Sequence, residues 1–343
     1  MRVDQQHDGG SGGRARLRDV ARLAGVSTMT VNRVLQQPHK VAPATRARVE
    51  NVLRETGYTP DLAARGLALR RTGLVGAIVP LLTNALIAEV LQGLTDAIAE
   101  NGMQLLVGAS GFSAQQEESL IMTLLSRRID ALYLMGQMRT PHAIAKLHQA
   151  RIPIVEGGNL LVHPIDMAVG YSNERAAADM TRHLISLGRG PVGYIGTFIA
   201  DNDRARDRRK GYEAALREAG IAVAPQRIVE AELTMTGGAS AMATLIQRAA
   251  DTRAVFCSAD ALAAGALFEC QRRAIDVPEV IAIGGFDDLE LAGQLVPALT
   301  TIRVPRYALG LRAGRMLCDR LAKREVPEPV VDVGYEFVRR ASA

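Results

Sequence analysis

The chain has 343 residues, a length that predicts two or three units, each able to bury its own core. Apolar residues make up 48% of it, yet no apolar run reaches the roughly 18 residues that a membrane helix needs. The charge of +5 is uneven: residues 14–71 hold twelve Lys and Arg against four Asp and Glu, which gives this segment +8 and the remainder −3. Such a small basic module is typical of a polyanion binder.

Residues 1–16 are polar and rich in glycine, without the apolar segment of a secretory signal, so we expect a flexible tail and a cytoplasmic protein. Cys257, Cys270 and Cys318 show no C-x-x-C spacing and predict small core residues rather than disulfides or a zinc site. The histidines lack ligand spacing as well. We therefore expect neither a metal nor a cofactor.

Residues 17–59 predict three short helices. An apolar stripe along 17–24 indicates the first helix, and Gly25 ends it where a positive φ costs little. Ser27 is the expected N-cap of a second helix, 28–36, that buries Val31 and Val34. A third helix is expected from about Thr45 to Thr56, with Gly57 as the C′ residue that follows its end. Two helices joined by a tight glycine turn form a helix-turn-helix.

In a helix-turn-helix the second helix enters the major groove with its N-terminus first. Small hydroxyl side chains there let the backbone approach the duplex and bond phosphates, while Met29 can contact a thymine methyl group and Arg33 a phosphate or a guanine edge. An arbitrary helical hairpin would not explain why hydroxyls and positive charge coincide. The expected DNA contacts of this module are Ser27, Thr28, Met29, Thr30, Asn32, Arg33, Lys40 and Thr45.

The stretches "LRDVARLAGVSTMTVNRVL" and "VAPATRARVENVLRETGYTPDLAARGL" resemble the DNA-binding head and hinge of the LacI/GalR repressor family. The resemblance implies a homodimer that reads a palindromic operator with the helix 28–36. Thr28 and Met29 match the two main specificity positions of the family, and Arg33 matches its base-reading arginine.

Residues 60–73 predict a hinge. Pro60 and Asp61 form a helix start, but a helix of about two turns that contains Gly66 is too short to persist alone in water. The resemblance implies that this segment folds on the operator, where Leu67 enters the minor groove and Ala64 makes the close helix contact.

From residue 74 onward, short β-rich runs alternate with amphipathic helical stretches, which predicts parallel sheets covered by helices on both faces. The fold class is therefore α/β, with an N-terminal helix-turn-helix domain. The resemblance implies a core of two subdomains like those of periplasmic binding proteins. We expect the N-subdomain at about 74–171 and 304–331, and the C-subdomain at about 172–303 and 332–340.

Ligands of open α/β sheets bind at the carboxyl ends of the strands, where this sequence places Asn84, Glu156, Arg208 and Asp287. Carboxylates, an amide and an arginine suit hydroxyls and an anionic group, as in a sugar acid. Glu156 could equally be an ordinary strand-end carboxylate, and Asp287 a turn cap.

The resemblance also implies roles for these positions. Arg208 matches the effector-binding arginine of the family, and Asp287 in "GFDD" matches its hydroxyl-binding aspartate. Asp260 matches a well-marked family position, with Ala259 in place of the usual asparagine. Stretches such as "LTNALIAEVLQGL" and "PIDMAVGYSN" are most similar to the gluconate-operon repressor branch.

We expect a transcriptional repressor that a sugar acid such as gluconate releases allosterically from operator DNA. The alternatives are a family member that answers to 2-ketogluconate, another sugar or a co-repressor, and a solute-binding protein. An enzyme is disfavoured because G-x-G-x-x-G after a strand, G-x-x-x-x-G-K-[ST] and G-x-S-x-G motifs are all missing. The end of the chain after Tyr335 has no leucine heptads, which favours a dimer over a tetramer.

Overall fold

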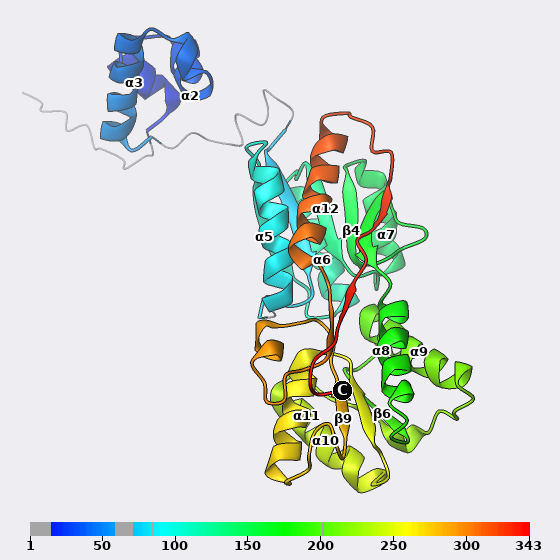
Figure 1. The fold of residues 1–343 in the computed structure, drawn as a ribbon. Helices are drawn as coiled ribbons and strands as arrows, with labels where there is room; N and C mark the ends of the chain where they lie inside the picture. Colours follow the sequence, from blue (N-terminus) through cyan, green and yellow to red (C-terminus); the bar gives the residue numbers. More distant parts are fainter. Residues whose placement is uncertain (1–14, 59–70, 84, 201) are drawn as a thin grey trace, which may run out of the picture. The chain divides into compact units, whose positions relative to one another are not determined.

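The computed structural model describes residues 15–58, 71–83, 85–200 and 202–343. The chain divides into two compact units, Met1–Thr72 and Gly73–Ala343, which we call the head and the core and describe separately (Figure 1). Ala64 and Leu67 of the expected hinge, and Asn84 of the expected effector site, lie outside the described residues.

The head folds as three helices around a small apolar cluster. The helices are α1 (Leu17–Leu23), α2 (Thr28–Gln36) and α3 (Pro43–Thr56), and a 3-10 turn (Pro38–Lys40) connects the last two. Val20, Val31 and Val49, one from each helix, are fully buried in the cluster. The predicted helix-turn-helix is confirmed.

Local capping explains where the helices of the head begin and end. The Oγ atom of Ser27 accepts a hydrogen bond from the backbone N–H of Thr30 at 3.1 Å, so its predicted role as N-cap is confirmed. Gly25 and Gly57 adopt φ angles of +65° and +59°, which only glycine reaches at little cost. Helix α3 begins at Pro43, two residues before the predicted start, because the fixed φ of proline suits the first helical position.

The core contains a six-stranded parallel sheet in the order β11-β5-β4-β3-β1-β2. Its strands are β1 (Leu74–Val79), β2 (Gln104–Ala109), β3 (Ala131–Met135), β4 (Ile154–Asn159), β5 (Met167–Tyr171) and β11 (Val330–Asp332). The helices that accompany it are α5 (Ala85–Ala99), α6 (Ala114–Ser126), α7 (Pro141–Ala150) and α12 (Arg306–Leu321). We call this assembly the N-lobe.

Alternate side chains of these strands enter two separate apolar clusters, as the period of two of a β-strand requires. Val79 and Tyr133 pack with α5 and α12 in one cluster. Ile78, Leu132 and Leu134 pack with α6 and α7 in another. The sheet is therefore covered on both faces, which confirms the predicted α/β class.

A four-stranded parallel sheet, in the order β7-β6-β8-β9, forms the second lobe of the core, the C-lobe. Its strands are β6 (Val192–Gly196), β7 (Ile228–Glu230), β8 (Ala254–Cys257) and β9 (Ala282–Gly284). Helices α8 (Asn173–Ser186) and α9 (Asp203–Glu218) pack against one face, and α10 (Met235–Arg248) and α11 (Asp260–Arg272) against the other.

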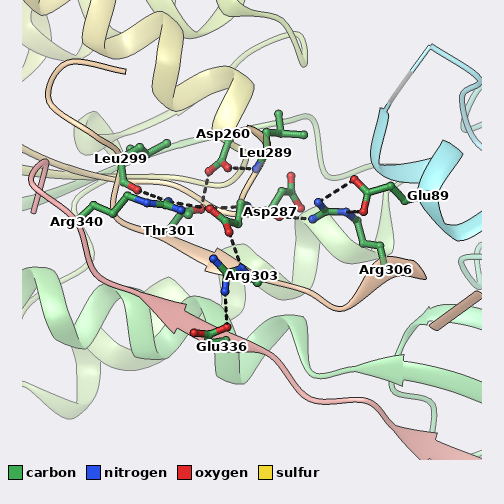
Figure 2. Close-up of polar contacts among 11 residues, drawn as sticks. Glu89, Asp260, Asp287, Leu289, Leu299, Thr301, Arg303, Arg306, Glu336 and Arg340 are labelled. Carbon is green, nitrogen blue, oxygen red and sulfur yellow. Dashed lines mark hydrogen bonds and ion pairs between the residues drawn. The ribbon is translucent and has the colours of Figure 1, made fainter. Parts of the chain in front are cut away.

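The chain passes between the two lobes at residues 171–173, 303–306 and 332–336. The last two crossings carry the short antiparallel pair β10 (Thr301–Arg303) and β12 (Glu336–Val338). Arg303 and Glu336 face each other in this pair and form an ion pair at 2.7 Å (Figure 2). Cross-strand charges of opposite sign stabilise such a short pairing.

The three cysteines are buried and form no disulfide, so the prediction that they are core residues is confirmed. No helix in the described part of the chain is long and apolar enough to cross a membrane. Over the same residues, no group of three or more His, Cys, Asp and Glu side chains has the arrangement of a metal site.

Candidate functional site

Helix α2 exposes the residues that the sequence singles out for DNA contact. Val31 is buried, whereas Thr28, Asn32 and Arg33 are exposed, and Met29 is 68% exposed. A methionine this exposed adds little to the core of the head. The outer side of α2 therefore presents hydroxyl, amide, thioether and guanidinium groups together.

The remaining predicted contacts lie close to α2 in the chain. Ser27 is exposed, and its Oγ lies 3.0 Å from the Oγ1 atom of Thr30. Lys40 is exposed in the 3-10 turn, and Thr45 is half-buried in the first turn of α3. Hydroxyls and a lysine at helix starts and turns are groups that can bind phosphate oxygens.

A cavity lies between the two lobes of the core, with an empty volume of about 830 Å³ counted out to its open mouth. Its N-lobe wall is mostly apolar and includes Leu81, Ile87, Val90 and Leu309. Its C-lobe wall is polar and includes Thr197, Asn202, Arg204, Arg208, Ser258 and Asp287. Among the described residues that line it, Asp287 is the single carboxylate, and Arg204, Arg208 and Arg306 supply three guanidinium groups.

Arg208, predicted from the sequence, lies at the centre of the polar wall. Its Nε donates to Oδ1 of Asn173 at 2.8 Å, its Nη1 to the carbonyl oxygen of Ser258 at 2.6 Å, and its Nη2 to the hydroxyl of Tyr171 at 3.2 Å. The guanidinium carbon lies 3.7 Å from the ring centroid of Phe286, in the geometry of a cation–π contact. The protein therefore fixes the plane of this guanidinium group.

Asp287, the second predicted residue of the cavity, is brought next to Arg208. Its Oδ1 lies 3.4 Å from Nη2 of Arg208. Its carbonyl oxygen accepts a hydrogen bond from Nη1 of Arg306 (Figure 2). Burial raises the pKa of the Asp287 carboxyl, although the charges of Arg208 and Arg306 act in the opposite direction. The carboxylate is thus a desolvated acceptor with room for a better donor, such as a hydroxyl group.

Glu156 requires a correction, because its carboxylate is engaged elsewhere and does not line the cavity. It is 3% exposed, pairs with Nη1 of Arg139 at 2.6 Å and accepts from the backbone N–H of Ile165 at 2.7 Å. Arg139 in turn pairs with Glu117 at 2.8 Å. A buried carboxylate needs such partners, so Glu156 holds strand β4 and its neighbours together rather than facing a ligand.

Asp260 is likewise a structural group. Its carboxylate accepts from the Thr301 hydroxyl at 2.6 Å and from the backbone N–H of Leu289 at 2.8 Å (Figure 2). Burial, together with the nearby negative charge of Asp287, raises its pKa to about 7. Its neighbour Ala259 lines the cavity and offers only a methyl group there.

Two cavity arginines were missed at the sequence level. Arg204 precedes Arg208 by four residues, so both lie on one face of α9, and this spacing was the available signal. Arg306 begins α12, and its guanidinium bonds both carboxylate oxygens of Glu89, at 3.1 and 3.2 Å. No local pattern marks Arg306, because only the fold brings it to Asp287.

A helix-turn-helix head, joined in one chain to a two-lobed core with a cavity between its lobes that has one apolar and one polar wall, defines the class of ligand-responsive transcriptional regulators. Two family models match the chain. "Bacterial regulatory proteins, lacI family" matches residues 16–61, and "Periplasmic binding protein-like domain" matches residues 181–343.

The chain belongs to the LacI family and is a DNA-binding transcriptional regulator, not an enzyme. It is 32% identical to the HTH-type transcriptional regulator GntR of Escherichia coli K12, over 93% of this chain and 96% of that one. It is 34% identical to the HTH-type transcriptional repressor CytR of the same strain, over 96% of both. Among solved structures, a LacI family regulator from Silicibacter pomeroyi matches with a TM-score of 0.88 and 30% identity, over 96% of this chain and 99% of that one.

Proposed function

We propose that this regulator is a homodimeric repressor, and that a sugar acid such as gluconate binds between the lobes of its core and releases it from a palindromic operator. The observation that carries the choice of effector is the charge of the cavity, which three arginines and one aspartate line. An excess of guanidinium groups favours an anion, and Asp287 is an acceptor for a hydroxyl.

The comparisons support the regulator and leave the effector open. The identity to GntR is 32% and that to CytR is 34%, so overall similarity does not favour one of these relatives over the other as a guide to the effector. The choice of effector therefore rests on the chemistry of the cavity. A small polyhydroxylated anion matches its polar wall, which lies in the C-lobe.

In the head, we assign base reading to Thr28, Met29 and Arg33, with Asn32 beside them on the exposed side of α2. Phosphate contacts go to the hydroxyls of Ser27, Thr30 and Thr45 and to the ammonium group of Lys40. Ala64 and Leu67 keep the roles that the family resemblance gives them in the hinge.

The effector acts through its different affinity for two arrangements of the lobes, since a ligand can shift an equilibrium only by that difference. Contacts from both walls of the cavity favour one arrangement, and the lobes in turn set the spacing of the two hinges in the dimer. A tenfold loss of operator affinity needs only about 1.4 kcal/mol of coupling.

The test is fluorescence anisotropy of full-length protein with palindromic duplexes selected from random DNA, with and without D-gluconate, 2-ketogluconate or sorbitol. We expect tight binding to one palindrome and release by an acid. Tighter operator binding in the presence of the acid would show that the acid is a co-repressor and not an inducer, which contradicts the proposed release. Equal affinity for all duplexes, in every ligand condition, would contradict operator binding itself.

A further inference from the structure

The three arginines of the cavity differ in how completely the protein already satisfies them. For Arg208, each of the three guanidinium nitrogens donates to a protein oxygen, and the Phe286 ring covers one face of the group. Four of its five N–H donors are engaged, since Nη2 also bonds Asp287 at 3.4 Å, so a two-point contact with an anion would displace Asn173, Ser258, Tyr171 or Asp287. Their buried polar atoms would then lose a partner, at a cost comparable to the hydrogen bond gained.

Arg306 is engaged in a similar way. Its Nε and Nη2 atoms bond the carboxylate of Glu89, and its Nη1 donates to the carbonyl oxygen of Asp287 (Figure 2). Its positive charge is therefore already balanced by a carboxylate. Its side chain ties α5 of the N-lobe to the loop after β9 in the C-lobe.

Arg204 is different, because its Nη1 atom is buried and has no hydrogen-bond partner in the part of the chain that the structure describes. The atom lies near the backbones of Gly136 and Gly158, with φ angles of +96° and +103°. A Cβ atom at Gly158 would lie 3.3 Å from Nη1, a separation tighter than nine in ten real Cβ contacts. Two glycines thus leave the space into which this guanidinium group extends.

We propose that Arg204 is the residue that binds the carboxylate of the effector and sets the preference of the cavity for a sugar acid over the neutral sugar. This inference rests on the proposed function and names the group that recognises the charge. A carboxylate oxygen would satisfy the free N–H of Nη1 in a charge-assisted hydrogen bond, in a setting from which water is largely excluded. The hydroxyls of the same ligand then reach Asp287 and Ser258, which line the same cavity.

The three arginines of the cavity then have different roles. Arg208 orients the polar wall, Arg306 links the lobes, and Arg204 distinguishes charge. It follows that replacing Arg204 affects ligands according to their charge, whereas replacing Arg208 disturbs the wall for every ligand, because Asn173, Ser258 and Tyr171 depend on it.

The experiment is calorimetry of the full-length protein with D-gluconate, with 2-ketogluconate and with sorbitol, which carries a neutral CH₂OH group in place of the carboxylate of gluconate. We expect Arg204→Gln to weaken gluconate binding about 10- to 100-fold and to leave sorbitol binding unchanged, as loss of one charged hydrogen bond predicts. Arg204→Lys, which keeps the charge, should retain a preference for gluconate. Arg217→Gln, an exposed arginine on the same helix, is the control and should bind as the wild type does.

Gluconate affinity within twofold of wild type in folded Arg204→Gln overturns the assignment, as does an Arg204→Lys variant that binds gluconate no better than Arg204→Gln. Thermal unfolding shows whether each variant is folded. If Arg204→Gln is not folded, the gluconate affinity of Arg204→Lys tests the assignment instead. A wild-type protein that binds neither gluconate nor 2-ketogluconate overturns the proposed effector and this inference together. If the wild type binds gluconate and the Arg204 variants contradict the assignment, only this inference is overturned and the proposed effector stands.

Discussion

The side-chain amide of Asn173 donates from Nδ2 to Oδ1 of Asn159 at 2.6 Å, and this bond joins α8 of the C-lobe to the end of β4 in the N-lobe. The pair belongs to a longer chain of polar contacts. Arg208 donates to Asn173 at 2.8 Å, and Asn159 donates to Asp203 at 3.1 Å. The cavity is thus connected by buried hydrogen bonds to a point where the two lobes meet.

This connection predicts the effect of Asn159→Ala. The substitution removes an acceptor from Asn173 and a donor from Asp203, which are 1% and 4% exposed. We expect the free energy of unfolding to fall by about 1 to 3 kcal/mol, the usual result of leaving buried polar groups without a partner. Urea unfolding followed by circular dichroism measures it, with exposed Gln92→Ala as the control. An unchanged midpoint for Asn159→Ala would show that water replaces the amide at no cost.

A second prediction concerns the contact between α5 and α12. A Cβ atom at Gly310 would lie 1.9 Å from the carbonyl oxygen of Val90, so the two helix backbones approach as closely as glycine allows. Gly310→Ala should therefore lower the free energy of unfolding by about 3 kcal/mol or more, because backbone cannot move aside as a flexible side chain can. Gly293→Ala, where a Cβ atom meets nothing within 4 Å, should change it little. Equal melting temperatures for the two variants would contradict this view of the helix contact.

The secondary structure was largely predictable because most strands of the two large sheets are apolar runs bounded by turn residues, as in β1, β3, β5, β6 and β8. β9 is three residues long but lies within the apolar run 280–286, whereas β7, β10, β11 and β12 are three residues long without such a run and are too short to show a period. They exist because a partner lies beside them, as Glu336 does for Arg303. Such pairing is set by the tertiary fold and leaves no local signal.

Arg208 and Asp287, which line the cavity, were predictable because each follows the carboxyl end of a parallel strand, Arg208 in the next helix and Asp287 in a loop. Glu156 shows the limit, because its place at a strand end gave no hint of Arg139, which lies 17 residues earlier. Whether a carboxylate meets a ligand or a buried arginine depends on which loops the fold brings together. Arg306 was not predicted as a cavity residue for the same reason, since its contact with Glu89 spans 217 residues of the sequence.

The buried carboxyl of Asp260 predicts a dependence of stability on pH. Its pKa is raised from 3.8 to about 7, by burial first and by the charge of Asp287 next. Between these values the folded protein holds a proton that the unfolded chain has released, so the free energy of unfolding falls as pH rises from about 4 to about 7. The group therefore contributes a destabilisation that is absent at low pH and complete above pH 7.

The Asp260→Asn variant checks this dependence, because the amide keeps the size of the side chain and cannot titrate. We expect the free energy of unfolding of the wild type, relative to the variant, to fall by about 1 to 3 kcal/mol between pH 5 and pH 8. Loss of the hydrogen bond to Leu289 would lower the stability of the variant equally at every pH. The pH dependence of the difference between the two proteins therefore reports only the titration of Asp260. Parallel pH curves for the two proteins would mean that Asp260 is ionised throughout.

The last prediction separates reading of DNA from folding of the head. Met29 is 68% exposed and Val31 is fully buried, although they stand two residues apart on α2. Met29→Ala should leave the melting temperature unchanged and weaken the selected operator about tenfold, as loss of a base contact worth about 1 to 3 kcal/mol predicts. Val31→Ala should lower the stability of the head, because it leaves a cavity in a cluster of only seven buried side chains.

The salt dependence of binding separates base contacts from phosphate contacts. Because Met29 is assigned to base reading, its replacement should leave the salt dependence unchanged. Lys40→Ala should make the slope of log affinity against log salt less steep by about one, the contribution of one phosphate contact. A Met29→Ala head that binds operator and random DNA as the wild type does would remove Met29 from the recognition surface.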